Sequence, residues 1–292
     1  MITRRALGAG ALATALGAVG CAPAVQAPSA APGTPVSPPS PVADRPSSTP
    51  PASPSATPSP TPTGPDPDEV ARRFAKKKPT DWGMHLPGIV SELEEPSTAD
   101  GRARIALTFD ACGGKHGSGF DERLISGLVD RGVPATLFVN LRWIEANPDV
   151  VKDLLTEPRF ELGNHGTRHI PLSVTGREAY GIAGSASASE AVAEVWECHQ
   201  RLAELLGAPP RFFRSGTAHY DDVGVAIATA LGGTPLGFSL NGDAGATFPA
   251  ATVRSEVRSA RPGGIVIAHF NRPDSGTAKG MLAAVDDLMA EG

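Results

Sequence analysis

The sequence predicts an α/β fold made of parallel strands that alternate with helices. Short apolar runs typical of buried strands alternate with amphipathic segments typical of helices from about residue 104 onwards. Polar and ionisable residues stand just past the ends of those runs, at the rim where βα barrels build their active sites. These residues are Asp110, His165, Arg214, Asp243 and His269.

Each element is predicted from its apolar pattern and its boundary residues. The apolar runs predict strands over 104–109, 135–139, 159–162, 211–214, 235–240 and 264–268. The segments between and after them predict helices over 121–131, 147–156, 189–206, 222–231, 250–260 and 277–289. Asn147 and Pro148 form a cap and first-turn pair, Ser189 is expected to cap the long helix, and Gly207 is expected to end it.

The first 20 residues have the features of an export signal. Arg4 and Arg5 form a twin-arginine pattern, and the apolar segment that follows is too short to span a bilayer. Small residues before Cys21 resemble a bacterial lipoprotein box, which implies cleavage before Cys21 and diacylation of its sulfur. The alternative is a secretory signal followed by a chance cysteine. We expect an exported protein, anchored through lipidated Cys21 to the outer face of the cytoplasmic membrane.

The segment from Ala22 to about Asp68 is rich in Pro, Ser, Ala and Thr, which favours extended conformations and cannot build a core. The predicted organisation is therefore a twin-arginine, lipoprotein-type signal peptide over 1–20, a disordered linker over 21–78 and a folded domain over 79–292. Such a tether would let the domain reach into the cell wall.

The charge of the chain gives no case for binding nucleic acid, because its 292 residues carry a net charge of −5. The basic run over 72–78 follows acidic residues and is interpreted as a solvated face. We expect a monomer.

Two histidines four residues apart, His165 and His169, follow the third predicted strand. At this spacing two imidazoles can converge on one face of a turn, and neutral imidazole is a common ligand of zinc, nickel, cobalt and iron(II). The alternative is a coincidental pair on a solvated loop. The other polar strand ends favour a metal site.

Five segments, in this order, resemble the motifs of the polysaccharide deacetylase (NodB-homology, carbohydrate esterase) family over about 190 residues. They are Thr108-Phe109-Asp110-Ala111, His165-Gly166-Thr167-Arg168-His169, Arg214-Ser215-Gly216-Thr217, Asp243, and Ile265-Val266-Ile267-Ala268-His269. The resemblance implies a distorted (β/α) barrel of about seven parallel strands. It also implies one bound divalent metal and removal of acetyl groups from N- or O-acetylated sugars.

The chain departs from this pattern at Ala111, where the family has an aspartate that binds the metal. The third motif also lacks the usual proline and aromatic residues. Two repairs are open. Either Asp110 binds the metal, or the two histidines hold it with waters or with a side chain such as Cys112, His116 or His219.

The resemblance and the chemistry of amide hydrolysis together suggest a role for each residue. His165, His169 and Asp110 would hold one divalent metal, zinc with cobalt or nickel as alternatives. Asp110 would also act as the base, and His269 would act as the acid.

Two further residues complete the predicted catalytic set. Arg214 would orient Asp110, and Asp243 would hold His269 protonated. The alternatives are an ion pair between Arg214 and Asp243, and an Asp243 that only binds backbone amides of its own turn.

The predicted function is a metal-dependent hydrolase that removes acetyl groups from N-acetylated sugars of a cell-envelope polysaccharide such as peptidoglycan. The alternatives are a deacetylase of O-acetylated sugars and a glycan-binding pseudoenzyme, which the missing aspartate favours. The chain has no Gly-x-Ser-x-Gly elbow, which argues against a serine hydrolase.

Overall fold

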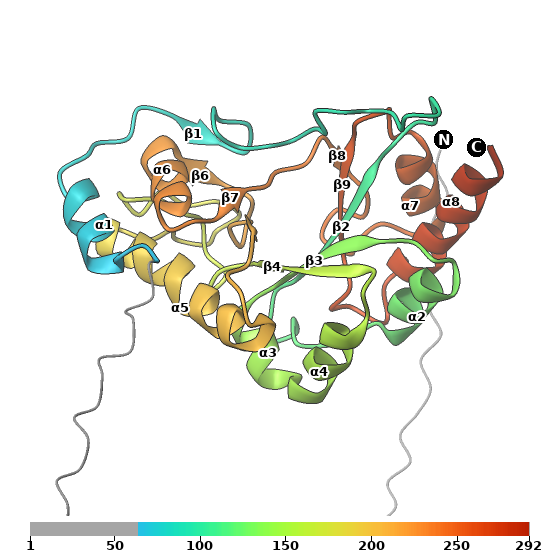
Figure 1. Cartoon of the computed structure of the whole chain (residues 1–292), viewed down its shortest axis with the longest axis horizontal. Coiled ribbons are helices and arrows are strands. Elements are labelled where there is room, and N and C mark those ends of the chain that lie inside the picture. Colours follow the sequence, from blue (N-terminus) through green and yellow to red (C-terminus); the bar gives the residue numbers. More distant parts are fainter. Residues whose placement is uncertain (1–63, 292) are drawn as a thin grey trace, which may run out of the picture. The chain divides into compact units, whose positions relative to one another are not determined.

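The computed structural model describes residues 64–291, so the predicted signal peptide, Cys21 and most of the predicted linker lie outside the described residues. Within the described part, seven strands form one parallel sheet in the order β7-β5-β4-β3-β2-β9-β8. The sheet curls into an open, distorted barrel with helices around it (Figure 1). The predicted α/β fold of about seven parallel strands is therefore confirmed.

The strands of this sheet are short. Because neighbouring strands run parallel, their carboxyl ends all lie on the same rim of the barrel. They are β2 (Ala106–Ala111), β3 (Ala135–Val139), β4 (Phe160–Asn164), β5 (Phe212–Phe213), β7 (Thr234–Pro235), β8 (Leu240–Asn241) and β9 (Ile265–His269). Two further strands, β1 (Trp82–Gly83) and β6 (Tyr220–Asp221), form a separate antiparallel pair.

Eight helices lie in the described part of the chain. They are α1 (Pro67–Phe74), α2 (Glu122–Asp130), α3 (Leu141–Ala146), α4 (Pro148–Thr156), α5 (Ala188–Leu206), α6 (Asp222–Ala230), α7 (Ala250–Arg258) and α8 (Thr277–Glu291). Gly207 ends α5 with a left-handed φ of 70°, as expected. The cap of α5 is Ser187, whose hydroxyl accepts from the backbone of Glu190, and not the predicted Ser189.

The predicted single strand over 235–240 is instead two short strands on opposite edges of the sheet, because β7 pairs with β5 and β8 pairs with β9. The backbone between them crosses from one edge to the other. There the carbonyls of Leu236 and Gly237 accept hydrogen bonds from the Arg214 guanidinium rather than from a neighbouring strand. A buried cation thus replaces part of the sheet ladder.

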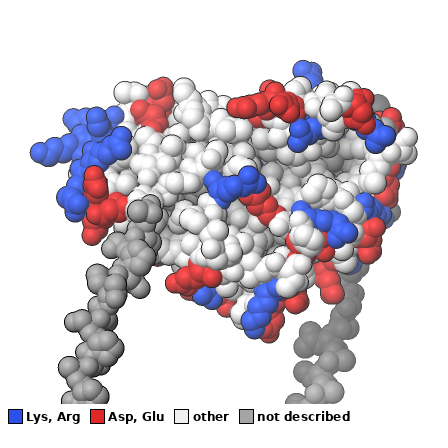
Figure 2. Space-filling model, in the orientation of Figure 1, with Lys and Arg blue, Asp and Glu red and all other residues white. Residues whose placement is uncertain are grey.

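The folded unit includes residues that precede the predicted boundary at 79. Asp66 caps α1, and Val70 and Phe74 of this helix are buried in a cluster that also contains residues of α5 and α6. Figure 2 shows a patch of basic side chains at its left, where Figure 1 places α1. The exposed basic residues of α1 and of the stretch that follows it are Arg72, Arg73, Lys76, Lys77 and Lys78. No helix within 64–291 is long and apolar enough to cross a membrane.

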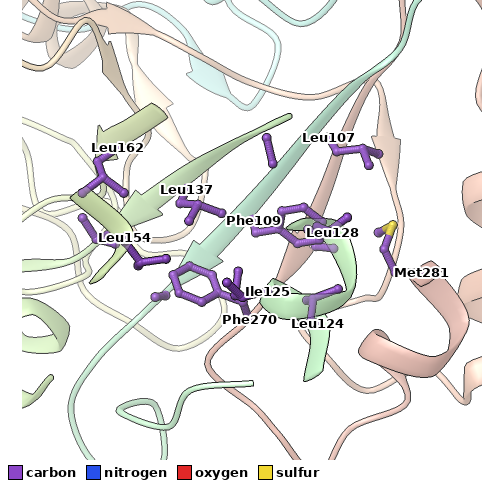
Figure 3. Close-up of a cluster of buried hydrophobic side chains, with 14 of the residues drawn as sticks. Leu107, Phe109, Leu124, Ile125, Leu128, Leu137, Leu154, Leu162, Phe270 and Met281 are labelled. Carbon is purple, nitrogen blue, oxygen red and sulfur yellow. The ribbon is translucent and has the colours of Figure 1, made fainter. Parts of the chain in front are cut away.

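Side chains of β2 alternate between the core and the barrel interior, as the two-residue period of a strand requires. Leu107 and Phe109 pack in the main hydrophobic cluster with Leu124 of α2 and Met281 of α8 (Figure 3). Thr108 and Asp110 belong to the opposite set, and both contact the Arg214 guanidinium. The same alternation that buries the core therefore turns the Asp110 carboxylate toward the interior of the barrel.

Candidate active site

The parallel sheet brings the predicted site residues together at one rim. Asp110 and His269 are register partners on β2 and β9. β4 runs directly into His165, and its last residue, Asn164, is itself paired with β5. A cleft of about 550 Å³ opens here, and Asp110, Cys112, His169 and His269 are among the residues that line it.

The two histidines of the pair lie edge to face, with ring centroids 4.9 Å apart. His169 has a left-handed φ of 62°, which is uncommon for a residue other than glycine. Gly216 packs directly against its backbone, where an added Cβ would lie 2.3 Å from the His169 carbonyl carbon. A glycine is therefore required at this position of the third motif.

His165 is 1% exposed, and its tautomer is fixed by its surroundings. Its Nδ1 lies 3.0 Å from the carbonyl oxygen of Arg214, so Nδ1 carries the proton that is donated. Nε2 then presents a lone pair, and it has no hydrogen-bond partner in the described structure. A buried nitrogen of this kind suits a metal ligand, because ligating histidines donate their other ring N–H to a carbonyl or carboxylate.

Cys112 completes a cluster with the two histidines. Its Sγ and one nitrogen from each of His165 and His169 all lie within 4.8 Å of one another. Burial acts to raise the pKa of the Cys112 thiol, but the neighbouring imidazoles, His169 first among them, outweigh it and hold the pKa well below its usual range. These three side chains can supply the donors of a transition-metal site.

Asp110 is held by Arg214, which is completely buried. The Arg214 Nη1 lies 2.8 Å from Asp110 Oδ1 and also donates to the Thr108 hydroxyl at 2.9 Å. Burial acts to raise the pKa of the Asp110 carboxyl, but Arg214, His165 and His269 together outweigh it, and the pKa falls below its usual range. The other oxygen, Oδ2, lies 3.5 Å from His165 Nε2. The structure thus pairs Arg214 with Asp110 rather than with Asp243.

His269 is paired with Asp243, which is fully buried. Its Nδ1 lies 2.9 Å from Asp243 Oδ1, and its backbone N–H donates to Oδ2 at 2.8 Å. Burial acts to lower the pKa of His269, but the Asp243 carboxylate, together with Cys112, outweighs this and raises the pKa well above its usual range. Asp243 Oδ1 also accepts a hydrogen bond from the Gly245 backbone N–H in its own turn. Asp243 therefore contacts both the His269 ring and the backbone of its turn.

The other histidines lie around the cleft or away from it. His116 lines the cleft, and His219 lies against Trp82 and Tyr180 with its Nδ1 2.8 Å from the Thr217 carbonyl oxygen. Neither histidine joins the cluster of close donor atoms. Tyr180 also lines the cleft and is 76% exposed.

The sequence pattern does not identify Glu194, a fully buried residue of α5. Its carboxylate accepts from the backbone N–H groups of Arg168 and His169, at 3.0 Å in each case, and from that of Ile170 at 3.4 Å. Burial raises the pKa of this carboxyl. The contact holds the loop that carries His169, and no local pattern in the sequence indicates it because 25 positions separate the two residues.

We expect Glu194→Gln to weaken zinc binding about 10- to 100-fold, the range typical of a lost outer contact to a metal ligand. An amide would place an NH₂ group against backbone N–H donors and loosen the strained backbone at His169. Titration with zinc against a competing chelator measures the effect. Glu197→Gln, an exposed change on the same helix, is the control. Equal affinity for both variants would contradict a positioning role for Glu194.

Comparisons with known proteins identify a family for part of this chain. Residues 98–236 match the family model for polysaccharide deacetylase. The sequence has no significant match among curated proteins.

Solved structures of several carbohydrate esterases share this fold. One is a family 4 carbohydrate esterase pseudoenzyme from Bacillus anthracis, at 19% identity and a TM-score of 0.56, with 71% of this chain and 66% of that one covered. Another is PdaA, a family 4 carbohydrate esterase from Bacillus subtilis, at 17% identity and a TM-score of 0.53, with 77% and 83% covered.

A peptidoglycan N-acetylglucosamine deacetylase has the same fold, at 20% identity and a TM-score of 0.53, with 70% of this chain and 84% of that one covered. At these identities the solved structures support the fold, while the family model carries the assignment. Residues 98–236 of this chain form a polysaccharide deacetylase domain.

Proposed function

We propose that the protein is a metal-dependent hydrolase that removes acetyl groups from N-acetylated sugars of a cell-envelope polysaccharide such as peptidoglycan. One observation carries the proposal. Three arrangements meet at one cleft. They are the Asp110 carboxylate held by Arg214, the His269 imidazole held by Asp243, and the pair of His165 and His169. The peptidoglycan deacetylase among the solved structures of this fold supports the substrate class.

The residues present fit a divalent metal, zinc in the first place. His165 Nε2 is buried without a partner in the described structure, and an imidazole nitrogen of His169 belongs to the same cluster of donors within 4.8 Å. A divalent ion bound by these histidines would polarise the acyl oxygen and lower the pKa of a water molecule.

The protein's own side chains supply the proton transfers of the hydrolysis. Asp110, kept ionised by Arg214, accepts a proton from the water that attacks the acetyl carbon. His269, kept protonated by Asp243, gives a proton to the departing amine nitrogen as the carbon–nitrogen bond breaks. Acetate and a free amine are the products. Asp110 and His269 are register partners on adjacent strands, which supports action on a single bond.

Features outside the described residues support the proposed substrate. The twin-arginine signal and the cysteine at position 21 would place the domain outside the cytoplasmic membrane, on a linker long enough to enter the cell wall. We propose this location together with the function. Tyr180, which lines the cleft and is exposed, offers an aromatic ring on which a sugar can pack.

The metal-loaded protein is expected to release acetate from N-acetylglucosamine oligomers and from peptidoglycan fragments. A chelator should abolish the release, and added zinc or cobalt should restore it, because an ion held by His165 and His169 would polarise the acyl oxygen. An enzymatic acetate assay measures both steps. Release from O-acetylated sugars alone would favour the ester-cleaving alternative. Glycan binding without release would favour a pseudoenzyme, and one solved structure of this fold is described as a pseudoenzyme.

A further inference from the structure

We propose that the Cys112 thiolate is the third protein ligand of this metal site, so that the chain holds its ion with one sulfur and two imidazole nitrogens. The inference rests on the proposed function, because it concerns the ion that the function requires. It follows from three observations on the described residues: the spacing of the donors, the engagement of the competing carboxylate and the orientation of the His165 ring.

The spacing of donors selects Cys112. Its Sγ and the nearest nitrogens of His165 and His169 form a set in which every atom lies within 4.8 Å of the others. Among His, Cys, Asp and Glu side chains of residues 64–291, this is the one set of three or more that meets this spacing. Cys112 stands one position beyond Ala111, just past the last residue of β2. The Cys112 sulfur can thus bind a metal, which the methyl side chain of Ala111 cannot do.

Asp110, the ligand that the sequence suggested, is engaged elsewhere. Its Oδ1 accepts a hydrogen bond from the buried Arg214 guanidinium at 2.8 Å. Its carboxylate contacts His165 at 3.5 Å but does not belong to the cluster of close donors. Removing Asp110 from the pairing would leave a buried guanidinium without its counter-charge, which is costly. A thiolate ligand leaves Asp110 free to accept a proton.

The orientation of the His165 ring supports the same set. Its Nδ1–H is donated to the Arg214 carbonyl, so the lone pair on Nε2 is the one available to a metal. That nitrogen is buried and has no hydrogen-bond partner in the described structure. Cys112 and His169 both line the cleft, so an ion held by the three residues would keep an open position toward substrate.

The chemical consequence concerns the choice of metal. Thiolate is a softer donor than carboxylate and suits zinc, whereas magnesium and manganese prefer oxygen ligands. A site with one sulfur and two imidazoles should therefore select zinc or cobalt over the harder ions. It should also be sensitive to thiol-modifying reagents when no metal is bound.

Cobalt(II) substitution tests the ligand directly, because cobalt bound to a thiolate shows a sulfur-to-metal charge-transfer band in the near ultraviolet. The chain has three cysteines, so the test uses the full-length Cys21→Ser/Cys198→Ser variant, in which Cys112 is the only one. Cys198 is a fair background change because its thiol is buried in the core and lies 3.4 Å from the Val139 carbonyl oxygen. We expect this variant to bind cobalt and to show the band.

Adding Cys112→Ser should abolish the band and weaken cobalt binding at least tenfold. The proposal is overturned if the variant that keeps Cys112 binds cobalt without the band. If the same cobalt-loaded variant still releases acetate, the proposed function is retained although the ligand is wrong. If the variant with Cys112 binds no metal and acetate release survives chelation, the metal dependence of the proposed function fails as well. The spectrum of the Cys21→Ser/Cys198→Ser variant shows whether Cys112 binds the metal even if the Cys112→Ser protein does not fold.

Discussion

Replacement of Asp110 by Asn is expected to lower the rate of acetate release by about 10³-fold, within the range for loss of a general base. An amide cannot take a proton from the attacking water. Its oxygen can still accept a hydrogen bond from Arg214 Nη1, which lies 2.8 Å from Asp110 Oδ1 in the unmodified protein. Loss of the counter-charge to a completely buried guanidinium should also lower the melting temperature. Steady-state kinetics and thermal unfolding measure the two effects separately.

The metal content of the Asp110→Asn protein distinguishes the two roles that the sequence left open. With Cys112 as the third ligand, zinc should stay bound while turnover is lost. A several-fold loss of zinc would instead make Asp110 a ligand, and retained activity would refute both roles. Asp121→Asn is the matched control, because Asp121 is equally buried but caps α2 outside the cleft, and asparagine also caps helices.

The fold could be predicted from the sequence because local pattern and global topology agree in most of this domain. The strand over 135–139 and the body of the helix that begins at Pro148 lie where the apolar periods placed them. Parallel pairing followed from the alternation of strands with helices, and it is what gathers Asp110 and His269 as neighbours. The polar residues at the ends of the predicted strands therefore indicate where the candidate site lies.

Other features depend on contacts between distant segments, which no local pattern reveals. Helix α1 is short and lies at the end of a polar, proline-rich stretch, and only its burial against α5 and α6 shows that it belongs to the domain. The stretch around Leu236 reads as a strand, but its carbonyls turn to Arg214. Glu194 stands in a helix among ordinary charged residues, and its burial against the His169 loop appears only in three dimensions.

The last expected result concerns the acid. In the proposed mechanism His269 acts in its protonated form, so the rate should fall as the pH rises through its pKa. Asp243, with a contribution from Cys112, raises that pKa well above the usual value. Asp243→Asn removes the charge that sustains this shift, so the alkaline fall should begin at a lower pH and kcat at neutral pH should drop about 10²-fold. The pH profile of kcat, measured with the zinc-loaded protein, checks both.

Asp243 also has structural contacts, so a second variant is needed to separate its charge from its place in the scaffold. Thr277 donates to Asp243 Oδ2 at 2.9 Å and is itself buried. Thr277→Val removes that hydrogen bond but keeps the carboxylate beside the His269 ring, 2.9 Å from Nδ1. If the charge is what matters, Thr277→Val lowers stability and leaves the alkaline limb in place. An alkaline limb that does not move in Asp243→Asn would mean that His269 is not the acid.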